Sequence, residues 1–250
     1  MPFFEFMEKD IYYRQAGQGP LLMILPGNTA SSACHGEDLA YFSNTFTAVS
    51  LDYLGTGQSD RLDTFGNDWY QQCADQAAAL IQHLNLGQAV LLGTSGGAVV
   101  ALHAAARHPN IFQGVIADSF TPVFTWEMLH ENVIEERSIR SEGQVAFWRM
   151  AHGEDWERVI DADTDMLKRL TESGGRWLGD ALARIVCPIL FTASLEDRML
   201  RQPASYTLQM LKEAHDGRAF LCQHGGHPLM WSNPGEFRRA VSGFLHSFLE

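Results

Sequence analysis

The chain is poor in cysteine, in long apolar runs and in positive charge, and each shortage excludes a class of protein. Its 4 cysteines show no C-x-x-C spacing, which indicates small buried thiols in a reducing compartment, not a disulfide framework or a zinc site. No apolar run is long enough to span a membrane, and residues 1–6 hold no basic segment followed by an apolar core. A formal net charge of -12 disfavours nucleic acid as a partner. We therefore expect a cytoplasmic protein without a membrane or nucleic-acid partner.

Strand-like and helix-like patterns alternate along most of the 250 residues, of which 46% are hydrophobic. Apolar or alternating runs predict strands at residues 3–7, 11–15, 21–25, 46–51, 89–92, 114–118, 189–193 and 218–223. The first two strands are expected to pair as a hairpin at the sheet edge. Helices are predicted from residue 67 or 68, directly after Ser95, at 126–137, 155–170 and 203–214, and around 237–248. This alternation is typical of an α/β fold with a mostly parallel central sheet flanked by helices.

The segment between about residues 119 and 184 departs from this pattern, because helical segments follow one another there with no strand signal. We predict an α/β core formed by residues 1–118 and 185–250, with residues 119–184 inserted as a helical cap. Large apolar side chains are frequent in this predicted cap: Trp126, Met128, Phe147, Trp148, Met150, Trp156 and Trp177. They suggest a pocket for a small molecule with an apolar acyl or alcohol part, although such side chains also pack against one another within a cap.

The sequence Gly93-Thr94-Ser95-Gly96-Gly97 lies between a predicted strand and a predicted helix. It matches the pattern G-x-S-x-G, in which a sharp strand-to-helix turn exposes the serine hydroxyl. Glycines two positions either side of the serine leave room for such a turn. A chance match is the alternative for a pentapeptide of common residues, and the strand and helix around it favour Ser95 as a nucleophile.

A serine hydroxyl needs a base within hydrogen-bond reach and a third group that orients the base. Among the 10 histidines, His227 lies in the flexible loop Gly225-Gly226-His227-Pro228, just past the last predicted strand. This loop can carry an imidazole over the end of the sheet. His224 is the local competitor, but it abuts the strand and lacks the flanking glycine. The sequence favours His227 as the catalytic base.

The orienting acid should also follow a strand and precede the histidine in the chain. Asp197 satisfies both conditions, since it lies shortly after the predicted strand at 189–193. Glu196 is adjacent and chemically competent, and Asp118 ends an earlier strand. Asp197 is favoured, Glu196 and Asp118 stay open, and any of them could instead be a loop carboxylate that caps a turn.

Acyl transfer also needs hydrogen-bond donors for an oxyanion. The backbone N–H of Gly96 at the helix start is one candidate, and that of Asn28, in the loop after the strand at 21–25, is the other. We expect no cofactor, because Gly55-Thr56-Gly57 lacks the lysine of a P-loop and the glycine pattern of a dinucleotide turn. We expect no metal, because His35 and His224 have no ligand spacing around them.

Four motifs in order give the chain a resemblance to the α/β-hydrolase fold superfamily, in its capped, single-domain, esterase-like form. They are the oxyanion loop Pro26-Gly27-Asn28, the D-x-x-G-x-G-x-S loop at 52–59, the elbow around Ser95 and the histidine segment 225–228. The resemblance implies a Ser-His-Asp triad, and it implies that the loop at 52–59 is structural, so that Asp52 is not catalytic. Many members have His-Gly where this chain has Pro26-Gly27, and a glycine where it has Ser194 before the acid.

The resemblance implies a serine hydrolase that cleaves a small carboxylic ester, thioester, lactone or amide through an acyl-enzyme. One alternative is a carbon–carbon bond hydrolase of the meta-cleavage-product type, which uses the same triad. A ligand-binding protein on a hydrolase scaffold without catalysis is another, because fold does not fix function. Dehalogenase and epoxide-hydrolase chemistry is disfavoured, since similar enzymes of those types have aspartate where this chain has Ser95.

Overall fold

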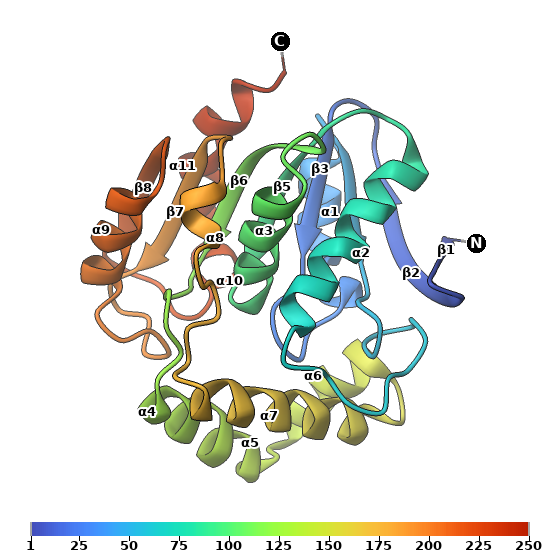
Figure 1. Cartoon of the computed structure of the whole chain (residues 1–250), viewed down its shortest axis with the longest axis vertical. Helices are drawn as coiled ribbons and strands as arrows, with labels where there is room; N and C mark the ends of the chain where they lie inside the picture. The colour runs from blue at the N-terminus through green and yellow to red at the C-terminus, as the bar shows by residue number, and fades with distance from the viewer. Residues whose placement is uncertain (1, 250) are drawn as a thin grey trace.

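The computed structural model describes residues 2–249, which form an α/β fold around an eight-stranded sheet (Figure 1). The strands are β1 (Phe3–Phe6), β2 (Lys9–Ala16), β3 (Leu21–Leu25), β4 (Thr47–Leu51), β5 (Ala89–Thr94), β6 (Phe112–Asp118), β7 (Ile189–Ser194) and β8 (Gly217–Cys222). Their order across the sheet is β1-β2-β4-β3-β5-β6-β7-β8. The β1–β2 and β2–β4 pairs are antiparallel and all other pairs are parallel. The predicted fold class and edge hairpin are confirmed.

The helices lie mainly in the connections between strands. The α-helices are α1 (Gly36–Phe42), α2 (Trp69–Leu84), α3 (Gly96–Arg107), α4 (Trp126–Leu129), α5 (Glu136–Ile139), α6 (Glu142–His152), α7 (Trp156–Glu172), α8 (Ala181–Arg184), α9 (Pro203–Glu213), α10 (Leu229–Ser232) and α11 (Pro234–His246). A 3-10 helix, η1 (Ser32–His35), precedes α1, and a π-helix, η2 (His130–Glu135), joins α4 to α5. Among the described residues, no helix combines the length and the apolar character needed to cross a membrane.

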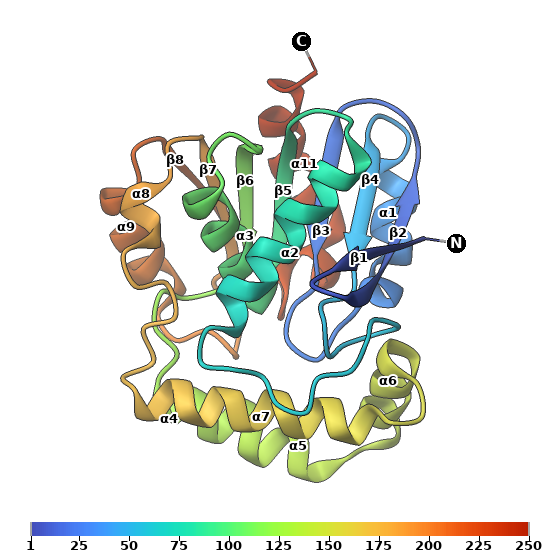
Figure 2. The same ribbon diagram turned by 45° about the vertical axis from the view of Figure 1, so that its right-hand side comes forward.

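The central strand β3 shows why the sheet is covered on both faces. All five of its residues are buried, so alternation of side chains sends apolar groups to both sides. Leu21, Met23 and Leu25 pack in the cluster that contains α2 and α3, whereas Leu22 and Ile24 pack in the cluster that contains α1 and α11. Figure 2 shows α2 and α3 in front of the sheet, with α1 and α11 behind it. The elements around β5 are therefore held rigidly from both sides.

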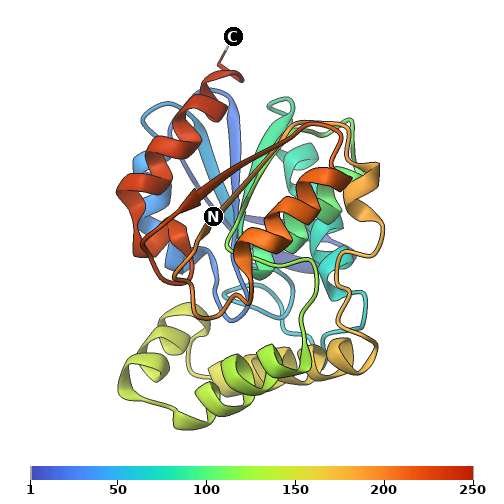
Figure 3. The ribbon, with the colours of Figure 1, turned by 90° about the vertical axis from the view of Figure 1, so that its left-hand side faces the viewer.

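Residues 119–184 contain no strand, and α4, η2, α5, α6 and α7 form a separate layer beyond one end of the sheet (Figure 3). Trp148 and Trp156 stack with ring centroids 5.2 Å apart and form a small apolar cluster of this layer with Ile160. The short α8 instead packs against α3, and its Leu182 belongs to the main core. The division into a core and a cap remains a prediction.

Several predicted bounds differ locally from the structure. The hairpin turn falls at Met7 and Glu8, both at positive φ, one residue earlier than the predicted connection. The helix predicted at 126–137 continues to Ile139 and contains the π-helical turn, in which the hydrogen-bond pattern changes within one helical stretch. The last helix, predicted around 237–248, ends at His246, so Phe248 lies beyond the end of α11. Neither α1 nor α6 was among the predicted helices.

Candidate active site

Ser95 lies at the tight turn between β5 and α3, in the left-handed region with φ 54°. Its N–H donates to the Asp118 carbonyl at 2.8 Å, which ties the turn to β6. A Cβ on Gly93 would lie 2.1 Å from the Gly97 carbonyl oxygen, and one on Gly97 would lie 2.1 Å from the Leu25 carbonyl oxygen. Only glycine fits at either position. The two glycines therefore permit the close approach of backbones that the tight turn at Ser95 requires.

His227 lies in the loop between β8 and α10, and its Nδ1 is 2.8 Å from Oδ2 of Asp197. The Asp197 side chain is fully buried, whereas 14% of the His227 side chain is exposed. The other Asp197 oxygen accepts the N–H of Met199 at 2.9 Å. Because the carboxylate only accepts, it fixes the His227 proton on Nδ1 and leaves Nε2 free to take another.

The structure separates the three candidate acids. Glu196 forms a 3.1 Å contact with His224 on the surface, so the alternative acid and the alternative histidine are bound to each other and not to His227 or Asp197. Asp118 is buried and accepts hydrogen bonds from the Thr192 hydroxyl at 2.7 Å and the Met230 N–H at 3.1 Å. Burial raises the pKa of Asp118 to about 6. Of the three acids, Asp197 is the one brought to His227.

The two predicted oxyanion donors come together beside Ser95. Gly96 begins α3, where the first N–H groups of a helix have no partner within the helix. A Cβ on Gly96 would lie 3.2 Å from the Asn28 backbone nitrogen and 1.7 Å from its Oδ1. Asn28 therefore packs directly against the start of α3 at Gly96.

The Asn28 side chain is held by a network that the sequence did not predict. Its Nδ2 donates to Oδ1 of Asp163 in α7 at 2.5 Å, and its Oδ1 accepts the Tyr70 hydroxyl at 3.1 Å. Oδ2 of Asp163 accepts Arg137 at 2.8 Å, and that guanidinium also donates to the Thr164 hydroxyl at 2.7 Å. The Asp163 side chain is 2% exposed. The network thus joins the oxyanion loop to the predicted cap.

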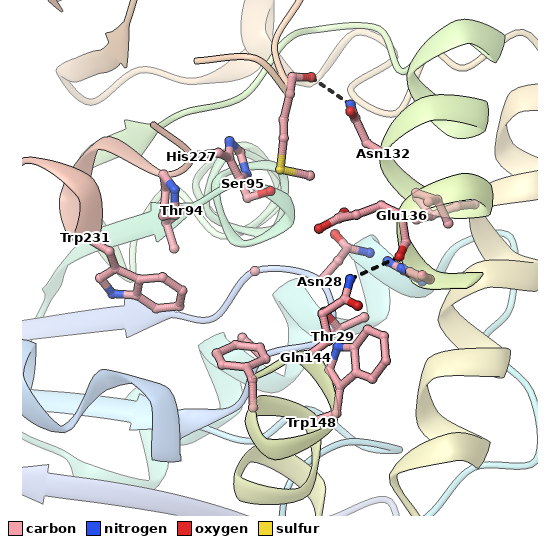
Figure 4. Close-up of a pocket in the computed structure, with 18 of the residues that line it drawn as sticks. Asn28, Thr29, Thr94, Ser95, Asn132, Glu136, Gln144, Trp148, His227 and Trp231 are labelled. Carbon is pink, nitrogen blue, oxygen red and sulfur yellow. Dashed lines mark hydrogen bonds between the residues drawn. The ribbon is translucent and has the colours of Figure 1, made fainter. Parts of the chain in front are cut away.

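A cavity of about 380 Å³ lies between the end of the sheet and the predicted cap, and Ser95, His227 and Asn28 all line it (Figure 4). Apolar side chains form most of its wall: Phe124, Val133, Phe147, Trp148, Leu167, Trp177, Met199 and Trp231. The expected apolar pocket is present, but Trp126, Met150 and Trp156 are not in its lining. Trp126 and Met150 are exposed, and Trp156 packs against Trp148. Met128 instead lines a smaller cavity that also reaches Ser95 and His227.

His152 at the end of α6 connects three segments around this cavity. Its Nε2 donates to the Thr29 carbonyl at 3.0 Å, and its Nδ1 accepts the N–H of Gly57 at 3.0 Å. Burial lowers the pKa of His152 to about 4, so the ring is neutral near pH 7. Asp52, at the start of the loop at 52–59, accepts the N–H groups of Ser32 and Gln58 at 2.7 Å each. These contacts hold the loop in place and leave Asp52 out of the cavity lining.

Within residues 2–249, no group of three or more His, Cys, Asp or Glu side chains could hold a metal ion. Ser95 and His227, which is paired with Asp197, line the cavity together with Asn28.

Residues 22–240 match the model of the family described as the alpha/beta hydrolase family. The chain belongs to this family and is a hydrolase of the α/β-hydrolase fold. A 2-(acetamidomethylene)succinate hydrolase of Mesorhizobium japonicum is 37% identical over 118 residues, which cover 46% of this chain and 41% of that protein. That match spans less than half of either protein. The human serine hydrolase BPHL is 27% identical over 243 residues, which cover 94% of this chain and 82% of that protein.

A solved structure of an E-2-(acetamidomethylene)succinate hydrolase shares the fold over nearly the whole chain. Its TM-score is 0.76 at 23% identity, and the match covers 98% of this chain and 99% of that chain. Similarity at this level shows the fold and leaves the substrate open.

Proposed function

We propose that this α/β hydrolase is a serine hydrolase that cleaves a small carboxylic ester, thioester, lactone or amide through an acyl-enzyme. The observation that carries the proposal is the 2.8 Å hydrogen bond from His227 to the buried Asp197. His227 lines the same cavity as Ser95. We assign Ser95 as nucleophile, His227 as general base and Asp197 as the group that orients His227. Carboxylic esters are the substrates that we propose first.

In the first half of the proposed reaction, Oγ of Ser95 attacks the substrate carbonyl carbon while its proton passes to Nε2 of His227. The Asp197 carboxylate stabilises the imidazolium that forms. Negative charge develops on the former carbonyl oxygen, where the N–H groups of Gly96 and Asn28 are proposed to receive it. Collapse of this intermediate breaks the bond to the leaving group, which takes the proton from His227.

In the second half, water attacks the acyl carbon and gives a proton to His227; the bond between that carbon and Oγ of Ser95 then breaks, Oγ takes the proton back from His227, and the acid is released. The apolar wall of the cavity supports a substrate with an apolar acyl or alcohol part. The Mesorhizobium relative is named as a hydrolase of an acetamido compound, which supports testing amides beside esters. We further propose that residues 119–184 act as a cap, because α5 and α6 contribute Glu136, Gln144, Phe147 and Trp148 to the cavity wall.

The proposal is tested by steady-state hydrolysis of short p-nitrophenyl esters, matched anilides, lactones and a vinylogous diketone. We expect turnover of at least one ester, thioester, lactone or amide by the wild type, with loss of turnover in Ser95→Ala. Turnover of the diketone alone would favour the carbon–carbon hydrolase. Equal ester turnover by Ser95→Ala, with correct folding of both proteins, would refute the assignment of Ser95.

A further inference from the structure

Two charged side chains of the predicted cap, Glu136 and Arg137, line the cavity. They are adjacent in sequence but differ in their partners. The Arg137 guanidinium is bound to the buried Asp163 carboxylate at 2.8 Å and to Thr164 at 2.7 Å. Its charge is thus neutralised by a carboxylate behind the wall. Arg137 therefore offers little attraction to an anionic substrate in the cavity.

Glu136 has no such neutralising partner within residues 2–249. Gln144 donates to its main-chain carbonyl at 3.1 Å, and no described residue forms a hydrogen bond to its carboxylate oxygens. Figure 4 shows the Glu136 side chain extending from its helix into the cavity, toward Ser95. A carboxylate without an ion-pair partner among the described residues thus borders the cavity, on an exposed residue.

Three other glutamates of the predicted cap are paired. Glu131 binds Arg201 at 2.5 Å, and Glu135 binds His130 at 3.2 Å. Glu157 forms an ion pair with Arg140. Glu136 is itself an exposed residue, but it differs from these three in its unpaired carboxylate and in its place on the cavity wall.

The remaining wall also favours a cation. Five aromatic residues line the cavity: Phe124, Phe147, Trp148, Trp177 and Trp231. The faces of aromatic rings carry partial negative charge and attract ammonium groups, and tryptophan does so most strongly. A carboxylate and several aromatic rings around one cavity are a combination that suits an organic ammonium group and disfavours a second carboxylate.

We propose that Glu136 and the aromatic wall bind an ammonium group of the substrate, so that the hydrolase acts on a cationic acyl compound. This inference rests on the proposed function, since it names the substrate class of the same site. It also separates this chain from the relatives named as succinate hydrolases, since succinate is a dicarboxylate. The carboxylate of Glu136 opposes the binding of a dianion, and the neutralised Arg137 offers a dianion little attraction.

The test uses three p-nitrophenyl esters whose acyl chains have the same length and differ at the far end. One ends in trimethylammonium, one in the isosteric tert-butyl group and one in a carboxylate. For the wild type we expect kcat/KM for the cationic ester to exceed that for the neutral ester by about tenfold, with the anionic ester slowest. In Glu136→Gln the preference for the cationic over the neutral ester should fall to about twofold. Glu135→Gln, which removes a paired carboxylate outside the cavity, should keep the wild-type ratio.

Failure of this inference can be told from failure of the proposed function. Hydrolysis of the neutral ester by the wild type but not by Ser95→Ala supports the proposed function whatever the charge preference. A cationic ester no better than its neutral isostere overturns the inference alone, as does a preference that survives in Glu136→Gln.

A binding measurement decides the inference even if no ester is hydrolysed. Butyltrimethylammonium is titrated calorimetrically into the Ser95→Ala, Ser95→Ala/Glu136→Gln and Ser95→Ala/Glu135→Gln proteins. Binding that weakens about fivefold or more on loss of Glu136, and not on loss of Glu135, supports the proposal. Equal binding by all three proteins, or no binding to the first, contradicts it.

Discussion

Asn28 and Asp163 lie 135 positions apart in the chain, and the Asn28 amide donates to the Asp163 carboxylate at 2.5 Å. One belongs to the proposed oxyanion loop and the other to α7 of the proposed cap. The Asn28 side chain is also held by Tyr70 at 3.1 Å. We therefore propose that the orientation of the Asn28 backbone N–H is coupled to the position of α7, and that a change in the proposed cap alters the stabilisation of the transition state.

This coupling predicts that Asp163→Asn lowers kcat more than it raises KM. The amide cannot neutralise Arg137, and the displaced Asn28 weakens a donor needed in the transition state. We expect kcat to fall by roughly tenfold to a hundredfold, since small misplacements near the reacting atoms have effects of this size. Asp165→Asn is the matched control, because Asp165 lies on the same helix, is exposed and pairs only with Lys168. Unchanged kcat in folded Asp163→Asn would contradict the coupling.

The choice of triad acid gives a second prediction. Asp197→Asn should lower kcat by about a thousandfold or more, because an amide no longer holds the proton of His227 on Nδ1. Glu196→Gln should stay within about twofold of the wild type, since Glu196 pairs with His224 on the surface. Steady-state kinetics of both variants at one pH compare them directly. The opposite ranking would assign the role to Glu196.

His152 gives a prediction for stability against pH. Its pKa falls from 6.5 to about 4 on burial, so between these values the unfolded chain binds the proton that the folded chain does not. The stability due to neutral His152 is thus present above about pH 6.5 and is lost as the pH falls toward 4. In chemical denaturation, we expect the advantage of the wild type over His152→Asn to shrink by about 2–3 kcal/mol between pH 7 and pH 4.5.

The comparison with His152→Asn is needed because Asp118 acts in the opposite direction. The pKa of Asp118 is raised to about 6 by burial, so Asp118 keeps its proton to a higher pH in the folded chain than in the unfolded chain. This group therefore favours folding below about pH 4, and that contribution is lost as the pH rises through 6. The wild-type profile alone mixes both effects, whereas the difference between the two proteins isolates His152. A pH-independent difference would contradict the neutral, buried state of His152.

Gly97 and Gly243 provide a matched pair of glycine substitutions within helices. A Cβ on Gly97 would lie 2.1 Å from the Leu25 carbonyl oxygen, whereas one on Gly243 would meet nothing within 4 Å. Gly97→Ala should destabilise the fold by about 3 kcal/mol or more, because backbone must move. Gly243→Ala should stabilise it by about 0.5–1 kcal/mol, since alanine favours a helix interior. Denaturant midpoints at neutral pH compare the two, and similar effects would contradict the packing at the elbow.

Local patterns predicted those parts of the molecule whose structure is set locally. The apolar run of β3 and the start of α3 after Ser95 follow from neighbouring residues, so their positions agree with the structure. The π-helical turn at 130–135 and the positions of Trp126 and Trp156 depend on what packs against them. The hydrophobic periodicity of the sequence gives no information about those packing partners.

The same limit applies to the site. The motifs located Ser95, His227, Asp197, Asn28 and Gly96 at the ends of strands, where a parallel sheet gathers its loops, and all five lie together in the structure. Asp163, Arg137 and His152 have no motif, because their partners are distant in the chain and lie on other elements. Their contacts could be identified only once the predicted cap was placed against the core.

The central claim, that Ser95 is a nucleophile activated by His227, is tested most directly by reaction with a fluorophosphonate followed by mass mapping of the adduct. The account predicts one adduct on Ser95 of the wild type, none in Ser95→Ala and at least about a hundredfold slower labelling in His227→Ala. A folded wild type that is not labelled at Ser95, or that is labelled equally fast without His227, would contradict it.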